Sequence, residues 1–165
     1  MTFGQRLTGV LKLQPATFEE IEASPSATGQ ALAVVVIASV AAGIGAGLTR
    51  GPVSLVQVTL AALIGWIMWA GVTYLIGGRL LREPGTHTDM GELLRVIGFS
   101  YAPNMFAFFA FIPFLGRVVQ VVVAFWLLAA TVIAVRQALD YRSTARAVAV
   151  VLIGWLLFVL ITAFV

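Results

Sequence analysis

The sequence predicts an all-α integral membrane protein, a five-transmembrane helical bundle with short N-terminal interfacial helices. Of its 165 residues, 61% are hydrophobic and only 10% are charged, whereas a soluble domain carries roughly 25% charged residues. The apolar residues gather in five runs, each long enough to cross a bilayer core of about 30 Å as a helix. Basic residues stand at the ends of these runs, so the formal charge of +3 indicates membrane topology and no nucleic-acid partner.

Residues 1–26 form the first predicted unit, a cytoplasmic N-terminal segment. Within residues 2–14, apolar side chains recur at helical spacing, while Arg6 and Lys12 fall elsewhere on the helical wheel. This pattern predicts a short amphipathic helix that lies in the membrane interface. The alternative is a frayed terminus, because two glycines in so short a segment weaken a helix.

A second short helix is expected after Pro15. Thr17 and Glu20 have the spacing of a capping box, in which a threonine at the helix start and a glutamate three residues later bond each other's backbone N–H groups. The predicted helix extends through Ile21. Residues 24–26, with a proline between two serines, end it and lead into the membrane domain.

The membrane domain comprises residues 27–165 and holds the five predicted spans. The first span ends in a glycine-rich stretch in which Gly43-x-x-x-Gly47 favours close packing of helices. A phosphate-binding loop is the weaker interpretation, since no strand is predicted before the glycines. The spans cover residues 27–48, 53–78, 96–115, 118–138 and 147–165.

The third predicted span is apolar enough to cross the bilayer, yet it contains two prolines. A proline inside a helix frees the carbonyl group one turn back, and hydrocarbon offers that carbonyl no water. We therefore expect a kink at Pro103 in the middle of the bundle. The polar side chains beside it either bond neighbouring helices or line a cavity or lipid-facing groove. The candidate kink and cavity residues are Ser100, Tyr101, Pro103, Asn104 and Pro113.

Other side chains near the spans are given structural roles. Trp66 and Trp69 lie near the middle of the second span and are interpreted as helix-packing residues rather than a ligand cage. Asp89 and Glu92 predict a capping box at the start of the helix that becomes the third span. The first turns of that helix are amphipathic, with Glu92 and Arg95 on its polar side.

A basic cluster follows the fourth span on the predicted cytoplasmic side. Arg136 and Asp140 are four residues apart and can pair at the helix end. Together with Arg142 and Arg146 they form a candidate contact site for anionic lipid headgroups or cytoplasmic partners. The alternative is that these arginines only signal topology.

The basic residues also assign the orientation of the spans. If the N-terminus is cytoplasmic, only Arg50 and Arg117 of the ten lysine and arginine residues lie outside, which leaves eight inside. The positive-inside rule therefore predicts a cytoplasmic N-terminus and an extracytoplasmic C-terminus. No cleavable signal sequence is expected, because the first apolar run follows a stretch that contains three glutamates.

The groups needed for catalysis are missing from the predicted spans. The chain has no cysteine and a single histidine, which falls in a loop, and no acidic residue lies in the core of a span. Enzymes that work in membranes need a nucleophile with a base, a metal cluster or paired carboxylates. We therefore expect no enzymatic activity, no cofactor and no metal.

Three motifs together resemble the Yip1 domain family, in the form of its bacterial members. A short helix precedes a motif that runs from Leu13 through Pro15 to Phe18-Glu-Glu-Ile21, and the third span contains Gly98-Phe-Ser-Tyr-Ala-Pro103. That span ends in Ile112-Pro-Phe-Leu-Gly116. The resemblance covers nearly the whole chain.

The resemblance implies a five-span protein with a cytoplasmic N-terminus, in the cytoplasmic (inner) membrane of a bacterium. Eukaryotic members are linked to Rab GTPases, to vesicle traffic and to assembly with one another. Phe99 occupies the position of a tyrosine in those members, and their acidic Asp-Leu-Tyr-Gly-Pro motif is missing before the first span. GTPase binding is therefore not carried over to this chain.

Two functional hypotheses remain. The leading one is a non-enzymatic multi-pass membrane adaptor or scaffold that associates with other membrane proteins or lipids, and with cytoplasmic partners through residues 1–26 and 79–95. The alternative is a small permeation protein that moves solutes or lipids as a homo-oligomer through the kinked third helix. Flux across liposomes separates the two hypotheses.

Overall fold

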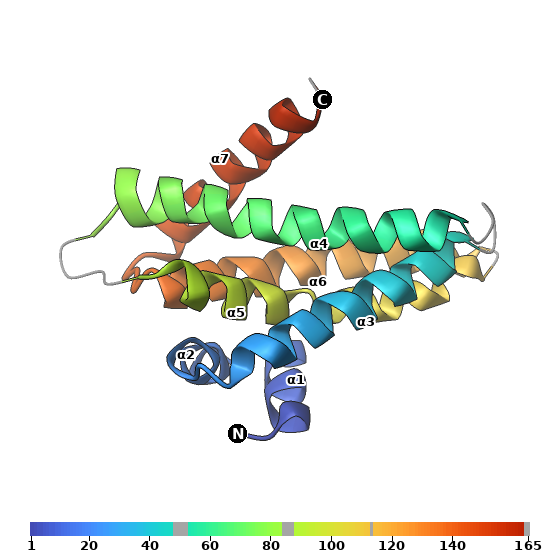
Figure 1. Cartoon of the computed structure of the whole chain (residues 1–165), viewed down its shortest axis with the longest axis horizontal. Coiled ribbons are helices and arrows are strands. Elements are labelled where there is room, and N and C mark those ends of the chain that lie inside the picture. Colours follow the sequence, from blue (N-terminus) through green and yellow to red (C-terminus); the bar gives the residue numbers. More distant parts are fainter. Residues whose placement is uncertain (48–52, 84–87, 113, 164–165) are drawn as a thin grey trace.

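The computed structural model describes residues 1–47, 53–83, 88–112 and 114–163, and these form a helical bundle (Figure 1). Two elements depart from α-helix: η1 is a π-helix and η2 is a 3-10 helix. The elements are α1 (Phe3–Leu11), α2 (Pro15–Ala23), α3 (Ala27–Gly47), α4 (Val53–Thr73), η1 (Tyr74–Leu80), α5 (Met90–Ser100), η2 (Ala102–Phe111), α6 (Leu115–Ala138) and α7 (Thr144–Ala163).

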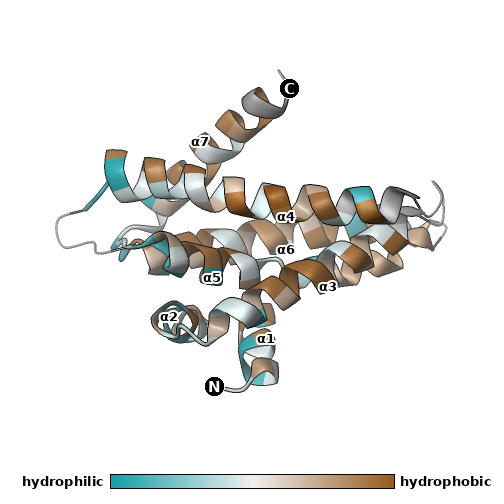
Figure 2. Ribbon diagram, viewed as in Figure 1, coloured by the Kyte–Doolittle hydropathy of each residue, from teal (hydrophilic) through white to brown (hydrophobic). Residues whose placement is uncertain are grey.

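The bundle is that of an integral membrane protein. In the described part of the chain, four helical stretches are long and apolar enough to cross a membrane: Ala27–Gly45, Thr59–Leu80, Met90–Phe111 and Leu115–Ala138. Helix α7 is apolar over the shorter stretch Thr144–Leu160, so a fifth span stays a prediction, as do the sides of the termini. Large apolar side chains cover the outside of the bundle, while hydrophilic residues gather on α1, α2 and the adjoining helix ends (Figure 2).

The chain passes back and forth between two ends of the bundle. Residues 15–26, 81–83, 88–89 and 139–143 lie together at one end, which we call the N-terminal end. Helix η2 ends and α6 begins at the opposite end. The charged residues predicted to be cytoplasmic thus share the N-terminal end of the bundle, apart from those on α1.

The main core lies where α2, α3, α5 and α6 meet. Its largest fully buried side chains include Phe18, Leu93, Ile97 and Phe99. No described residue of α7 belongs to this cluster. Side chains of α1 and α2 therefore contribute to the core, and the position of this segment in the membrane interface stays a prediction.

Close packing of α3 against η2 depends on Gly45, which lies between the two predicted packing glycines, Gly43 and Gly47. A Cβ atom at Gly45 would collide with the backbone carbonyl of Ala107. Gly43 is buried, whereas the surroundings of Gly47 lie outside the described part of the chain. Because only glycine lets two backbones approach this closely, Gly45 sets the distance between α3 and η2.

A second, smaller core fastens α7 to the bundle. It contains Ile76 of η1, Leu139 and Tyr141 after α6, and Val150 of α7. The Tyr141 hydroxyl lies 2.9 Å from the Gly77 carbonyl and 3.0 Å from the Leu81 carbonyl and donates to them. Only the first half of α7 is held in this way, and the helix then diverges from its neighbours (Figure 1).

Several predicted boundaries were wrong for local reasons. Helix α2 begins directly at Pro15, whose fixed φ suits the first helical position, so Thr17 lies inside the helix, buried, and does not cap it. Helix α6 begins at Leu115, before the predicted start of the fourth span at residue 118, and Phe114 with a left-handed φ of 66° makes the turn before it. By contrast, the capping box of Asp89 and Glu92 is confirmed.

Candidate functional site

The third span breaks where the sequence predicted, but by a change of helix type. Pro103 has no N–H to donate to the carbonyl one turn back, and α5 ends at Ser100. The chain continues as the 3-10 helix η2, in which the Asn104 N–H donates to the Tyr101 carbonyl at 2.9 Å. The complete apolar span is Met90–Phe111 rather than residues 96–115.

The Ser100 hydroxyl contacts two polar groups at the break, a backbone carbonyl of α5 and a hydroxyl of α6. Its hydroxyl donates to the Ile97 carbonyl at 2.7 Å and lies 3.3 Å from the Thr131 hydroxyl of α6. Thr131 in turn donates to the Leu127 carbonyl at 2.8 Å. Each hydroxyl carries one proton, so the two bond each other across the helices only when one of them turns its proton away from its backbone carbonyl.

The other predicted cavity residues separate in the structure. Pro103 is buried in the bundle, and Asn104 is partly exposed and does not line the groove described below. Pro113 lies outside the described residues. Tyr101 alone of this set faces a groove.

The groove lies between α4, α6 and α7 and has a volume of about 510 Å³. Its walls are mostly apolar, with Trp69, Leu128, Trp155 and Phe158 among them. Trp69 and Phe158 meet edge to face, with ring centroids 6.2 Å apart. Since 59% of Trp155 is exposed, the groove opens to the side of the bundle, where lipid lies.

Two polar side chains line this groove. The hydroxyl of Thr131 is already bonded within α6, but the Tyr101 hydroxyl has no hydrogen-bond partner among the described residues. Tyr101 is only half-buried, so its hydroxyl is accessible from outside the bundle, and hydrocarbon cannot supply a hydrogen-bond partner there. Tyr101 therefore brings an unpaired hydroxyl to whatever fills the groove.

Sequence reasoning found only part of this groove. Trp66 is a packing residue, as predicted, and its Nε1 donates to the Leu94 carbonyl at 3.0 Å. Trp69 was given the same role but also lines the groove. Trp155 and Phe158 of α7 were missed, although their spacing of three residues places both aromatic rings on one helical face.

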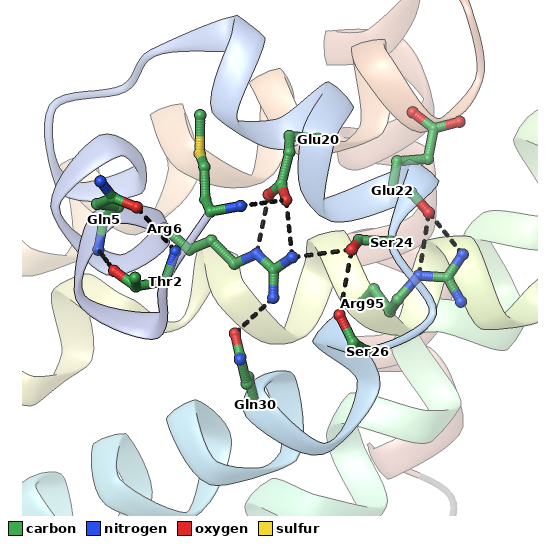
Figure 3. A network of polar contacts seen from close by, with 10 residues as sticks. Thr2, Gln5, Arg6, Glu20, Glu22, Ser24, Ser26, Gln30 and Arg95 are labelled. Atoms are coloured by element: carbon green, nitrogen blue, oxygen red, sulfur yellow. Dashed lines mark hydrogen bonds and ion pairs between the residues drawn. The ribbon is translucent and has the colours of Figure 1, made fainter.

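Arg6 connects the N-terminal helices to the bundle (Figure 3). The sequence placed Arg6 away from the apolar face of the first helix, yet this side chain is buried, with only 2% of Arg6 exposed. The guanidinium donates to both Glu20 carboxylate oxygens at 2.7 and 2.8 Å, and to Ser24 and Gln30 at 2.8 and 2.7 Å. These hydrogen bonds lower the pKa of Glu20 to about 2.

Arg95 also points inward rather than to the predicted polar side. Its guanidinium donates to the backbone carbonyl of Glu22, and the Glu22 carboxylate points away from it (Figure 3). Burial raises the pKa of Glu22 to about 7. Repulsion from Asp140, Glu92 and Glu19 adds to this rise and outweighs the attraction of Arg95.

Two arginines of the predicted basic cluster, Arg136 and Arg146, make other contacts. Arg136 donates to the Tyr141 carbonyl at 3.3 Å and does not pair with Asp140, because α6 ends at Ala138 and the chain turns before Asp140. Arg146 pairs with Glu83 at 3.0 Å and stacks over the Tyr141 ring. Arg142 is exposed. Binding of anionic lipid at these arginines stays a prediction.

The described residues contain no group of three or more acidic or histidine side chains placed to hold a metal ion. No curated protein and no solved structure matches this chain. A family model does match: the Yip1 domain, over residues 8–165. The match includes the end of α1, all of α2, the broken third span and the groove between α4, α6 and α7. This chain therefore belongs to the Yip1 domain family.

Proposed function

We propose that this protein is a membrane adaptor that holds a transmembrane helix of another membrane protein in the groove between α4, α6 and α7. The observation that carries the proposal is Tyr101, which lines a mostly apolar groove and whose hydroxyl has no hydrogen-bond partner in the described part of the chain. An unpaired polar group in hydrocarbon is costly, so an occupant that brings an acceptor is favoured.

The position of Tyr101 favours a helix over a phospholipid. Tyr101 stands in the interior of the apolar span Met90–Phe111, away from both of its ends. Phospholipid headgroups and ester groups lie at the ends of such a span, whereas a transmembrane helix can bring a side-chain or backbone oxygen to any depth.

The walls of the groove suit close approach of a helix. Gly65 and Ala124 line it with small surfaces, and only the Phe158 ring stands within 4 Å of the place where a Gly65 Cβ atom would be. Small residues let helix backbones approach in membranes, where van der Waals contact drives association. Trp69 and Trp155 add large apolar surfaces on either side.

Site-specific photocrosslinking in native membranes tests the proposal. A photoreactive residue at Leu128 or Leu152, both in the groove and exposed, is expected to form an adduct that maps to a transmembrane segment of one protein. The matched control is Ile37 on α3, which is 48% exposed. Tyr101→Phe removes one hydrogen bond and is expected to lower the adduct yield about fivefold.

The opposite result has a clear form. Groove positions that give the same adducts as Ile37, or only lipid adducts, contradict the adaptor. The lateral opening of the groove then favours the alternative, movement of lipid or solute. In that case purified protein in liposomes accelerates passage of labelled lipid or solute, and Tyr101→Phe combined with Asn104→Leu changes the rate.

A further inference from the structure

A second cavity, separate from the groove, lies at the N-terminal end of the bundle between η1 and the start of α5. Its volume is about 640 Å³. Among the described residues, four charged side chains line it, two of each sign: Arg79, Arg82, Asp89 and Glu92. The other described residues of its walls are Tyr74, Gly78 and Thr88.

The π-helix η1 fixes one basic side of this cavity. A π-helix brings residues five apart onto one face, and the Arg79 guanidinium stands 5.6 Å from the centroid of the Tyr74 ring. Arg79 makes no ion pair with a described residue. Its charge is therefore directed by the aromatic ring and available to a ligand.

The start of α5 fixes the acidic side. Asp89 Oδ1 accepts from the Glu92 N–H, and Glu92 Oε2 accepts from the Asp89 N–H, each at 2.8 Å. The second oxygen of each carboxylate has no partner among the described residues. Thr88 donates to the Ala138 carbonyl and ties this wall to α6. The acidic side is thus held in place with two acceptor oxygens to spare.

The depth of the cavity matches that of lipid headgroups. It begins at Tyr74 and Gly78, near the end of the apolar span Thr59–Leu80, and reaches Arg82 just beyond that end. On the same π-helix, Leu75 is 57% exposed and Leu80 is 78% exposed, so apolar surface lies next to the charged walls. A ligand with a polar head and apolar tails fits both surfaces.

We propose that this cavity binds the headgroup of a membrane phospholipid that carries a phosphate and a primary ammonium, as in phosphatidylethanolamine. The phosphate contacts the arginine side, and guanidinium groups bind phosphate with charge-assisted hydrogen bonds. The ammonium donates to the spare oxygens of Asp89 and Glu92. This site does not depend on the adaptor function or on its groove.

The test is native mass spectrometry of the full chain with equal amounts of phosphatidylethanolamine, phosphatidylcholine and phosphatidylglycerol. The expected result is selective retention of phosphatidylethanolamine. Phosphatidylcholine lacks the ammonium protons, and phosphatidylglycerol lacks the positive charge. Arg79→Gln is expected to lower retention of phosphatidylethanolamine and phosphatidylglycerol about tenfold each.

Asp89→Asn is the sharper variant, because asparagine caps a helix as well as aspartate does and α5 keeps its start. It is expected to remove the preference for phosphatidylethanolamine over phosphatidylglycerol. Arg142→Gln, the control, removes a charge at the same end of the bundle but outside the cavity, and is expected to leave retention of phosphatidylethanolamine unchanged. Equal retention of the three lipids, or a preference that Asp89→Asn leaves intact, overturns the proposal. So does displacement of the lipid by equimolar soluble O-phosphoethanolamine.

Discussion

Replacing Arg6 with leucine is expected to release α1 from the bundle. The guanidinium is buried and donates to the Glu20 carboxylate through two hydrogen bonds, and to Ser24 and Gln30. Breaking a buried ion pair by removing one partner costs about 3 to 5 kcal/mol. The lower figure applies here, because the Glu20 side chain is 27% exposed and stays paired with the Met1 amine at 3.0 Å.

A loss of about 3 kcal/mol raises the opening equilibrium of α1 roughly a hundredfold. Hydrogen exchange of the protein in nanodiscs measures this directly, as the loss of amide protection in peptides that cover α1. Lys12→Leu is the matched control, since it removes the same charge from the end of the same helix at an exposed position. The wild-type rate of exchange in both variants would refute the assignment of Arg6 as the residue that docks α1.

A double variant separates the ion pair from packing. Replacing a buried pair with apolar side chains is often neutral, so Arg6→Leu with Glu20→Leu is expected to recover most of the lost protection. Acid provides an independent check. The folded pKa of Glu20 is lowered to about 2 from an unfolded value of 4.5, so its contribution is present above pH 4.5 and is lost as the pH falls toward 2. Protection of α1 that stays constant over that range contradicts the reasoning.

Three further predictions concern stability, each measured as the thermal unfolding midpoint in detergent. Gly45→Ala places a methyl group against the Ala107 carbonyl and is expected to cost about 1 to 3 kcal/mol, whereas Gly29→Ala on the same helix, where the added Cβ atom meets nothing within 4 Å, is neutral or stabilising. Because the folded pKa of Glu22 is raised to about 7, the neutral carboxyl contributes its full stabilisation below about pH 4.5, and this stabilisation is lost as the pH rises through about 7. Glu22→Gln, which stays neutral at every pH, is therefore expected to raise the midpoint at pH 8 and leave it unchanged at pH 4. Tyr141→Phe removes the one hydroxyl proton that the Gly77 and Leu81 carbonyls share and is expected to cost about 1 kcal/mol, so an unchanged midpoint contradicts a structural role of this hydroxyl.

The membrane helices could be predicted from the sequence because the backbone N–H and C=O groups of each apolar run must hydrogen-bond one another in the membrane, which makes the run a helix. The break at Pro103 and the cap at Asp89 were equally local, since both depend on which backbone groups lack a partner. The spacing of apolar residues also gave the two short helices before Ala27. What it did not give was their position, because burial of Arg6 depends on Glu20, a partner fourteen residues away.

The candidate sites were harder to predict for the same reason. Tyr101 lines a groove only because α7 diverges from α4 and α6, and no periodicity in the sequence states the angle between helices. Arg136 and Asp140 have the spacing of a helical pair, but α6 stops between them. The opposite charges of Arg79 and Asp89 come together across a loop, where the sequence shows only their separate positions.

The way α7 is attached also sets an order of assembly. The main core contains residues from Val10 to Ala138 and, in the described part of the chain, none from α7. This core needs no residue of α7, so the earlier helices can pack before α7 docks. Helix α7 then docks on a finished surface through Ala147, Val150 and Val151, and its insertion is the step that closes one wall of the groove.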